Sequence, residues 1–212
     1  MGKHRVIRLS LGVAVFLYCV VFSALSIARY ATFHATTFDL GIISQVVWNT
    51  AHGRWFETSL GRATNWELIG SYLGNHVRPA LLLLAPLYRL WPDPRLLLIL
   101  QSVALGVAAV PLYRLAHRRL GDRVAALTIA CCYLAYPALG FLNLCDVHPI
   151  AFSIPCLFVA YRALLEKRVW LFGGAVLLAL FTKEEMVVPI GAWGLLCLLR
   201  RDRRRIGGAL LL

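Results

Sequence analysis

A series of apolar runs restricts this chain to a membrane environment. The first run, residues 9–28, follows Lys3, Arg5 and Arg8 and has the length of about 20 residues that a helix needs to cross a bilayer. The chain of 212 residues is 60% hydrophobic, more than the core of a soluble domain uses. In lipid the backbone must satisfy its own hydrogen bonds, so the runs predict an all-α polytopic membrane protein.

The charges and cysteines exclude several other classes of protein. The net charge of +12 is distributed in short basic groups beside the apolar runs, which is typical of cytoplasmic membrane loops. A nucleic-acid interface needs one continuous basic face, so nucleic acid is excluded as a partner. The six cysteines lie mostly within apolar runs and lack the spacing of disulfide or zinc sites, so they are interpreted as packing residues.

The remaining apolar runs and the basic groups predict a topology. Further spans are expected at residues 95–115, 124–142, 150–165, 169–181 and 186–199. A cytoplasmic N-terminus then places most of the 22 Lys and Arg residues inside, as the positive-inside rule requires, and residues 29–78 outside. The piece at 79–93 is broken by Pro86 and is too short to cross, so it is predicted to be a re-entrant or surface helix. We therefore expect about six transmembrane helices in the cytoplasmic (inner) membrane.

Residues 1–212 are expected to form one membrane domain. The apolar run at 206–212 is too short to span and follows the basic block RRDRRR. It is interpreted as the beginning of another helix. This predicts that the chain is the N-terminal part of a longer protein.

The stretch at 38–79 is the only long one that apolar residues do not dominate. A helix over residues 40–52 would carry a polar stripe on one side and lie on the membrane surface. The stripe would consist of Gly41, Gln45, Trp48, Asn49 and His52. The apolar side would consist of Leu40, Ile43, Val46 and Val47. Asp39 would stand at the start of this helix and Gly53 would end it.

In the predicted topology, two later polar turns reach the same external face as this loop. One is the turn at 143–149, with Asp146 and His148, and the other is Thr182-Lys183-Glu184-Glu185. Charges at the membrane surface are costly unless they are paired or hydrated, which makes these residues functional candidates together with His76 of the first loop.

Several strings resemble the DUF2079 family of bacterial predicted membrane proteins over essentially the whole chain. They are FDLGIISQVVWNTAHGRWFETSL, LGNHVRPALLLLAPLYRLWP, CDVHP and FTKEE. The resemblance implies a relationship to the GT-C glycosyltransferases, multispanning enzymes that use polyprenyl-phosphate sugars. In those enzymes an acidic residue of the first external loop is catalytic and an external Lys near a later span meets the lipid phosphate. Asp39 and Lys183 match by position.

Two departures limit what the resemblance implies. The first loop has no Asp-x-Asp or Glu-x-Asp pair, so no metal dependence follows and no cofactor is expected. The turn reads CDVHP where the family more often has an aromatic residue before the His, which leaves the nature of that pocket open.

The resulting hypothesis is a sugar transfer at the outer face of the cytoplasmic membrane, with polyprenyl-phosphate sugar and membrane lipids as partners. Asp39 would be the general base and Lys183 would bind the donor phosphate. The residues expected to bind the rest of the substrates are His76, Asp146, His148, Glu184, Gln45, Trp48 and Asn49.

Structural roles compete with these assignments. Asp39 could cap the helix that follows, and Asp146 could serve its own turn. Lys183 could reach the interface with Glu184 and Glu185 as solvated companions, and His76 could bond nearby backbone. Trp48, Trp55 and Trp66 could be interfacial anchors.

Other functions also remain open. A metal site from Asp39, His76, Asp146, His148 and Glu185 is chemically possible but has no signature spacing. A transporter or flippase of lipid-linked substrates would line a path with charges inside the membrane. A non-catalytic membrane scaffold would leave the three external clusters far apart.

Overall fold

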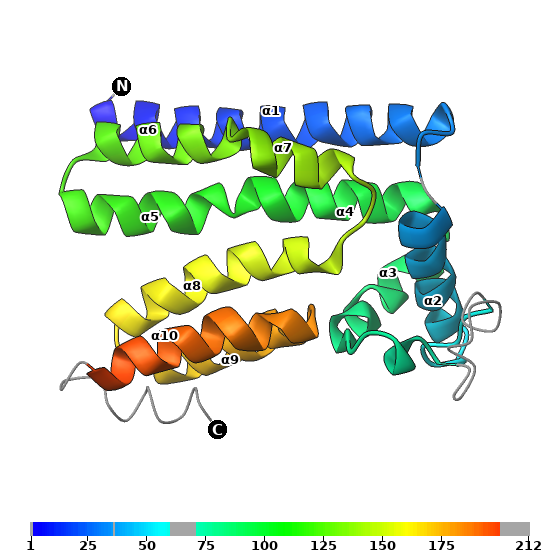
Figure 1. Ribbon diagram of the computed structural model, residues 1–212. Coiled ribbons are helices and arrows are strands. Elements are labelled where there is room, and N and C mark those ends of the chain that lie inside the picture. The colour runs from blue at the N-terminus through cyan, green and yellow to red at the C-terminus, as the bar shows by residue number, and fades with distance from the viewer. Residues whose placement is uncertain (1, 36, 60–70, 200–212) are drawn as a thin grey trace.

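The computed structural model describes residues 2–35, 37–59 and 71–199, and the regular elements within these ranges are all helical. The longest is α1 (Lys3–Ala31), which runs the length of the molecule (Figure 1). An isolated bridge between Glu57 and Ser71 is the one β-type pairing among these residues. Trp66, the basic block and the apolar run at 206–212, on which sequence predictions rest, lie outside the described ranges.

Two long apolar helices have the length to cross a membrane. One is α1, and the other is the rod made by α4 (Pro94–Val107) and α5 (Ala109–Leu120). The rod is interrupted at Ala108 because Pro111 has no N–H for the carbonyl of Val107, four residues before it. The predicted spans at 9–28 and 95–115 therefore correspond to observed helices.

A third crossing is formed if a bent pair of helices counts as one span. The pair is α6 (Arg123–Leu134) and α7 (Pro137–Leu144), which meet at 42°. Tyr136 is extended before Pro137, as residues before proline usually are, and this ends α6. Within residues 2–35, 37–59 and 71–199, length and composition thus support two or three spans, and the six expected are not confirmed.

The last three helices are apolar but short. They are α8 (Ser153–Leu165), α9 (Val169–Leu180) and α10 (Val187–Leu199), with 13, 12 and 13 residues. α8 follows the short 3-10 helix η5 (Pro149–Phe152), and η6 (Glu184–Met186) links α9 to α10. They coincide with the predicted runs at 150–165, 169–181 and 186–199. Each is shorter than the length of about 20 residues of a regular span.

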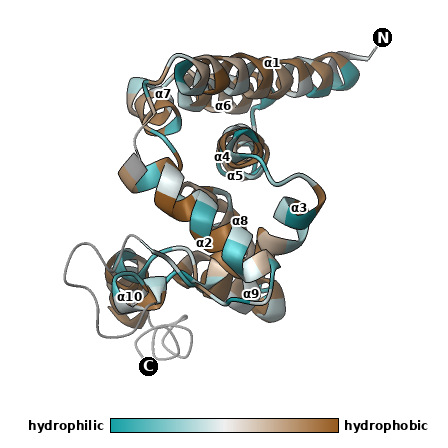
Figure 2. Ribbon diagram, turned by 90° about the vertical axis from the view of Figure 1, so that its right-hand side faces the viewer, coloured by the Kyte–Doolittle hydropathy of each residue, from teal (hydrophilic) through white to brown (hydrophobic). Residues whose placement is uncertain are grey.

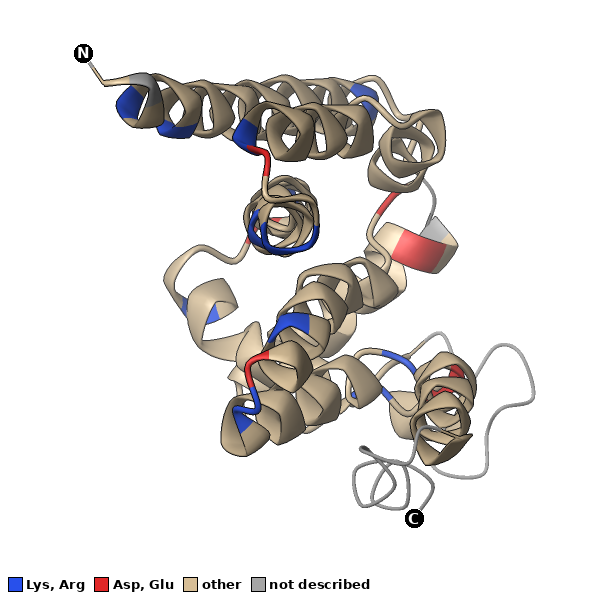
Figure 3. Ribbon diagram, turned by 90° about the vertical axis from the view of Figure 1, so that its left-hand side faces the viewer, with Lys and Arg blue, Asp and Glu red and all other residues tan. Residues whose placement is uncertain are grey.

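The long helices run back and forth between two ends of the molecule (Figure 1). We call one the loop end: it holds α2, α3 and the turns at 145–148 and 182–186, and Figure 2 faces it. We call the other the basic end: it holds the start of α1, the α5–α6 turn and the α8–α9 turn. Figure 3 faces the basic end, where several Lys and Arg residues lie at or near the helix termini. Which end faces the cytoplasm stays a prediction from the sequence.

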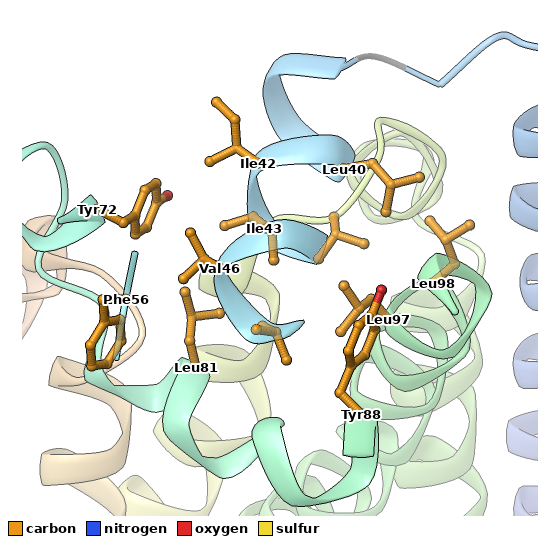
Figure 4. Close-up of a cluster of buried hydrophobic side chains, with 12 residues drawn as sticks. Leu40, Ile42, Ile43, Val46, Phe56, Tyr72, Leu81, Tyr88, Leu97 and Leu98 are labelled. Carbon is orange, nitrogen blue, oxygen red and sulfur yellow. The ribbon is translucent and has the colours of Figure 1, made fainter. Parts of the chain in front are cut away.

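The predicted surface helix lies across the loop end. A π-helical turn, η1 (Thr37–Gly41), leads into α2 (Ile42–Ala51). The predicted apolar side is confirmed, since Leu40, Ile43, Val46 and Val47 are buried. They pack in one cluster with Tyr88, Leu97 and other apolar side chains (Figure 4). Gly53 follows the C-cap residue His52 with a φ of 82°, a left-handed conformation that glycine adopts readily, so the predicted helix end is also confirmed.

The piece at 79–93 forms two short helices at the loop end. They are the 3-10 helix η4 (Pro79–Leu83) and α3 (Ala85–Leu90). Leu81, Ala85 and Tyr88 are buried on their inner side, and Tyr88 bonds the hydroxyl of Ser44 on α2 at 2.5 Å. The chain enters and leaves this piece at the same end of the molecule (Figure 1). α2 therefore packs against this piece.

Candidate functional site

The structure ties the first loop to the last turn at the loop end. His76 lies two residues beyond the 3-10 helix η3 (Tyr72–Gly74), and its Nδ1 is 2.6 Å from Oε1 of Glu184. The backbone N–H of Ala80 donates to the carbonyl of Phe181 at 2.9 Å. Residues more than 100 positions apart in the sequence are thus joined at two points.

A tyrosine and an arginine extend this contact. Nη1 of Arg78 donates to the hydroxyl oxygen of Tyr72 at 2.6 Å, and the guanidinium carbon lies 5.6 Å from the centre of the Tyr72 ring. Tyr72 is buried, and burial raises its pKa to about 12. Arg78 opposes this rise, while the carboxylates of Glu184 and Asp39 add to it. We call Asp39, Tyr72, His76, Arg78 and Glu184 the loop-end cluster. Direct contacts join His76 to Glu184 and Arg78 to Tyr72, and Asp39 is included because its charge affects the pKa of Tyr72.

Glu184 is held as a carboxylate by this cluster. Burial alone would raise its pKa, but the hydrogen bond to His76, a backbone hydrogen bond and the charge of Arg78 bring the pKa below the ordinary glutamate value. Its Oε2 and the Nε of Arg78 are buried and lack a hydrogen-bond partner among the described residues. A buried polar group without a hydrogen-bond partner costs about 1 to 3 kcal/mol. A conformation or a bound group that supplies such a partner would therefore be favoured.

Asp39 lies within the π-helical turn η1 and is exposed. The N-cap position of α2 is Gly41, two residues later, so Asp39 is not the N-cap residue of that helix. Single π turns in otherwise α-helical segments occur often at functional sites. The turn exposes the Asp39 carboxylate to solvent, and its negative charge adds to the raised pKa of Tyr72.

Lys183 has a carboxylate partner in the same turn. Its Nζ is 2.7 Å from Oε1 of Glu185, and the Lys183 side chain is only 21% exposed. The Glu185 side chain is 60% exposed, so water competes with this pair and its net contribution to stability is small. The ammonium group is therefore able to exchange Glu185 for another anion.

The buried side-chain amide of Gln101 holds the turn at 145–148 in place. Nε2 of Gln101 donates to the carbonyl of Asp146 at 2.7 Å, and its Oε1 accepts from the backbone N–H of His148 at 2.7 Å. Asp146 is buried and has a φ of 59°, a left-handed conformation that Asp tolerates in turns. Asp146 is therefore covered by neighbouring residues at the loop end, and its role in substrate binding stays a prediction. His148 is half-buried.

Gln101 belongs to an uncharged polar network between α1, α4 and α7. Oγ of Ser102 donates to Oδ1 of Asn143 at 3.0 Å, and Nδ2 of Asn143 contacts the Tyr18 hydroxyl at 3.3 Å. Gln101, Ser102 and Asn143 are fully buried. The network connects the interior of the long helices to the loop end, because it bonds the backbone of the turn that carries Asp146 and His148.

The predicted polar stripe of α2 is only partly exposed. Gln45 bonds the hydroxyl groups of Thr58 and Ser59, and the buried Asn49 donates to the carbonyl of Glu57 and accepts from Arg54. The expectation that Asn49 is exposed is therefore wrong, because its amide satisfies the backbone of the loop that follows α2. Both amides hold that loop onto the helix.

Trp48 and His52 are the exposed members of the stripe. Trp48 is 39% exposed, its ring centre lies 4.2 Å from that of His52, and Arg54 sits 5.2 Å from its ring centre. An aromatic face partly open to solvent can stack against a sugar ring or a lipid headgroup.

No group of three or more His, Cys, Asp or Glu side chains is arranged to hold a metal ion in the parts of the chain that the structure describes. The possible metal site from Asp39, His76, Asp146, His148 and Glu185 is therefore not assembled there. Of these residues, Asp146 is buried whereas Asp39 is exposed to solvent.

The model of the DUF2079 family, described as predicted membrane proteins, matches residues 29–212. The chain belongs to the DUF2079 family. No curated protein and no solved structure matches it. In this DUF2079 protein, the strings that carry the resemblance supply four of the five residues of the loop-end cluster: Asp39 lies in FDLG, His76 and Arg78 in GNHVRP, and Glu184 in FTKEE.

Sequence reasoning missed three residues of the DUF2079 site. Arg78 was treated only as the end of the external loop, although it stands two residues after His76 in the same string. Tyr72 carries no signal of its own. Gln101 could have been noticed as an amide in the middle of an apolar run, a position where a polar side chain needs a specific partner.

Proposed function

We propose that this DUF2079 protein transfers a sugar from a polyprenyl-phosphate donor to an acceptor hydroxyl at the outer face of the cytoplasmic membrane. The observation that supports the proposal is the loop-end cluster, in which an exposed carboxylate, Asp39, and a cation, Arg78, both influence the buried Tyr72 at one end of an apolar helical protein. Glycosyl transfer from a lipid phosphate needs both a base and a cation.

Asp39 would be the general base. Its carboxylate is exposed, so an acceptor hydroxyl can reach it, and it stands on a turn that the buried side of α2 fixes to the apolar cluster below. A base must lie within hydrogen-bond distance of the proton that it removes. Trp48 and the two histidines, His76 and His148, would orient the sugar and the acceptor.

Two cations would stabilise the departing phosphate. Arg78 holds Tyr72 through one nitrogen, and guanidinium groups bind phosphate oxygens through two parallel hydrogen bonds. Lys183 would exchange the exposed Glu185 for the phosphate, which fits the role that the family resemblance implies for it. Glu184 would keep His76 in place, while Gln45, Asn49 and Asp146 would support the surrounding loops through contacts of their side chains or backbone.

The topology proposed with this function has six crossings, with the N-terminus in the cytoplasm and the loop end outside. α1, the α4–α5 rod and the α6–α7 pair would be three of them, and α8, α9 and α10 the others. The support is the excess of Lys and Arg at the basic end, which would face the cytoplasm. The short helices would cross with local thinning of the bilayer.

The transporter alternative has less support. It predicts ionisable groups lining a path at the level of the spans. The polar network found there, from Gln101 to Asn143, is uncharged and its members bond one another. The scaffold alternative predicts clusters that stay apart, whereas contacts such as His76–Glu184 join two of them.

The test is a transfer assay with radiolabelled polyprenyl-phosphate sugars and membranes that contain the full-length protein. Asp39→Asn should abolish label transfer while the amount of protein in the membrane is unchanged. Glu57→Gln is the matched control, because Glu57 is a half-exposed carboxylate of the same loop and pairs only weakly with Arg54, at 3.9 Å. Transfer that persists in Asp39→Asn would exclude the proposed base.

A further inference from the structure

A single carboxylate at the basic end gathers three arginines. Glu166 follows the last residue of α8, and its oxygens lie 2.8 Å from Nε of Arg162, 3.2 Å from Nε of Arg168 and 3.7 Å from Nη1 of Arg118. Arg118 comes from α5 and also donates to the carbonyl of Leu165 at 3.0 Å. The end of α5 and the α8–α9 turn are therefore one continuous surface.

This surface carries a large excess of positive charge. Lys167 and Arg119 lie on the same two segments as the three arginines, so the segments carry five cationic side chains and one carboxylate, Glu166. The hydrogen bond from Arg162 lowers the pKa of Glu166, which stays ionised at neutral pH and neutralises one of the five charges. The side chains of Arg118 and Arg168 are 48% and 62% exposed. Much of the unneutralised charge therefore faces outward.

The local backbone explains how the charges come together. Lys167 has a φ of 57°, the left-handed conformation that commonly ends helices, and the N–H of Arg168 donates to the carbonyl of Ala163 at 2.9 Å. This turn folds Arg168 back over Glu166. Arg119 is held separately, by a hydrogen bond of 2.9 Å from its Nη2 to the Tyr161 hydroxyl.

The residues that follow indicate where the surface lies in a bilayer. Val169 and Trp170, which begin α9, are 67% and 94% exposed. An exposed tryptophan next to a basic turn is typical of the boundary between the acyl chains and the headgroups. The arginines would then lie at the depth of the lipid phosphates.

We propose that the end of α5 and the α8–α9 turn bind the headgroup phosphate of an anionic phospholipid. Guanidinium groups that a carboxylate already orients can donate paired hydrogen bonds to phosphate oxygens with little further ordering. Basic surfaces between helices at the headgroup level attract anionic lipids. The site lies at the opposite end of the molecule from the loop-end cluster, so its occupancy does not depend on the proposed transferase activity.

The test measures lipid binding to the purified full-length protein by native mass spectrometry, with phosphatidylglycerol compared with phosphatidylcholine. The wild type should retain phosphatidylglycerol preferentially. Arg118→Gln with Arg168→Gln should weaken its binding about tenfold or more, since each basic residue near a headgroup contributes measurably. Arg5→Gln with Arg8→Gln is the matched control: it removes the same charge from exposed positions at the same end and should leave binding within about twofold.

Two further measurements keep the proposal open to refutation. Lys167→Gln leaves the three Glu166 contacts in place and should weaken phosphatidylglycerol binding by about fivefold, even if the double variant fails to fold. If the control variant in α1 weakens phosphatidylglycerol binding equally, the lipid is attracted by the general positive charge and not by a site, and the proposal is wrong. Unchanged binding in both Lys167→Gln and the double variant would also overturn the proposal. Inorganic phosphate should not displace the lipid at equal concentration. Displacement would indicate a site for free phosphate.

Discussion

The two ends of the molecule use charge in different ways. At the loop end, acids and bases are mixed: His76 bonds Glu184, and Arg78 bonds Tyr72. Among the described residues, the buried Nε of Arg78 and Oε2 of Glu184 have no hydrogen-bond partner. At the basic end, one carboxylate serves several arginines and the rest of the charge is exposed. A mixed, packed cluster positions individual groups, whereas an exposed excess of one sign creates a field. This difference agrees with the two proposals, sugar transfer at the loop end and lipid binding at the basic end.

The strongest test of this contrast compares one arginine from each end. Arg78→Gln should reduce sugar transfer about 100-fold, because a preorganised donor to the departing phosphate is lost. Arg114→Gln, at an exposed position of α5, should leave transfer nearly unchanged. Initial rates in membranes with matched protein levels give the comparison. Equal losses in the two variants would show that the loop-end arginine has no special role.

The second test concerns the support below the site. Gln101→Leu should lower the free energy of unfolding by about 2 to 4 kcal/mol, because the His148 N–H and the Asp146 carbonyl lose a buried partner. Denaturant titration of the purified protein in detergent measures this change. Thr128→Val is the control, since Thr128 is exposed and its hydroxyl bonds only its own helix. A Gln101→Leu protein as stable as the control would mean that the turn does not need this amide.

The third test addresses the close approach of α1 and α4 between the two ends. A Cβ at Gly106 would lie 2.6 Å from Sγ of Cys19 and 3.1 Å from the Tyr18 ring. Gly106→Ala should therefore destabilise the protein by about 1 to 3 kcal/mol through overpacking. Gly12→Ala in α1 should be neutral or slightly stabilising, because a Cβ there has open space and alanine favours helix. Similar midpoints for the two variants would contradict the close packing.

The smallest expected effect is the pH dependence of stability that Glu184 contributes at the loop end. Because the pKa of Glu184 is lower in the folded protein than its ordinary value of 4.5, its contribution to stability is complete above that value. The contribution is lost as the pH falls through the lower folded value. Glu184→Gln should reduce the loss of stability at acidic pH by a fraction of the total change. Glu57→Gln, in an exposed pair, should not.

Periodicity predicted what depends on neighbours along the chain. The spacing of Leu40, Ile43, Val46 and Val47 predicted the buried side of α2, and Gly53 predicted its end. The spacing could not show that Asn49 is buried, because its partner is the carbonyl of Glu57, which a loop brings back onto the helix. In the same way, the sequence could not show that Lys183 pairs with Glu185 and not with a more distant anion.

The sequence alone determined the helical class, the family and the separation of basic turns from mixed polar turns, because apolar runs and basic groups are local and additive. Tertiary structure decided the composition of the candidate site. Tyr72, Arg78 and Gln101 acquired their partners only when distant segments packed together, since hydrogen bonds and charge effects depend on distances of a few ångströms that sequence separation does not encode. Burial decided the rest: it placed Asp146 inside and left Asp39 exposed.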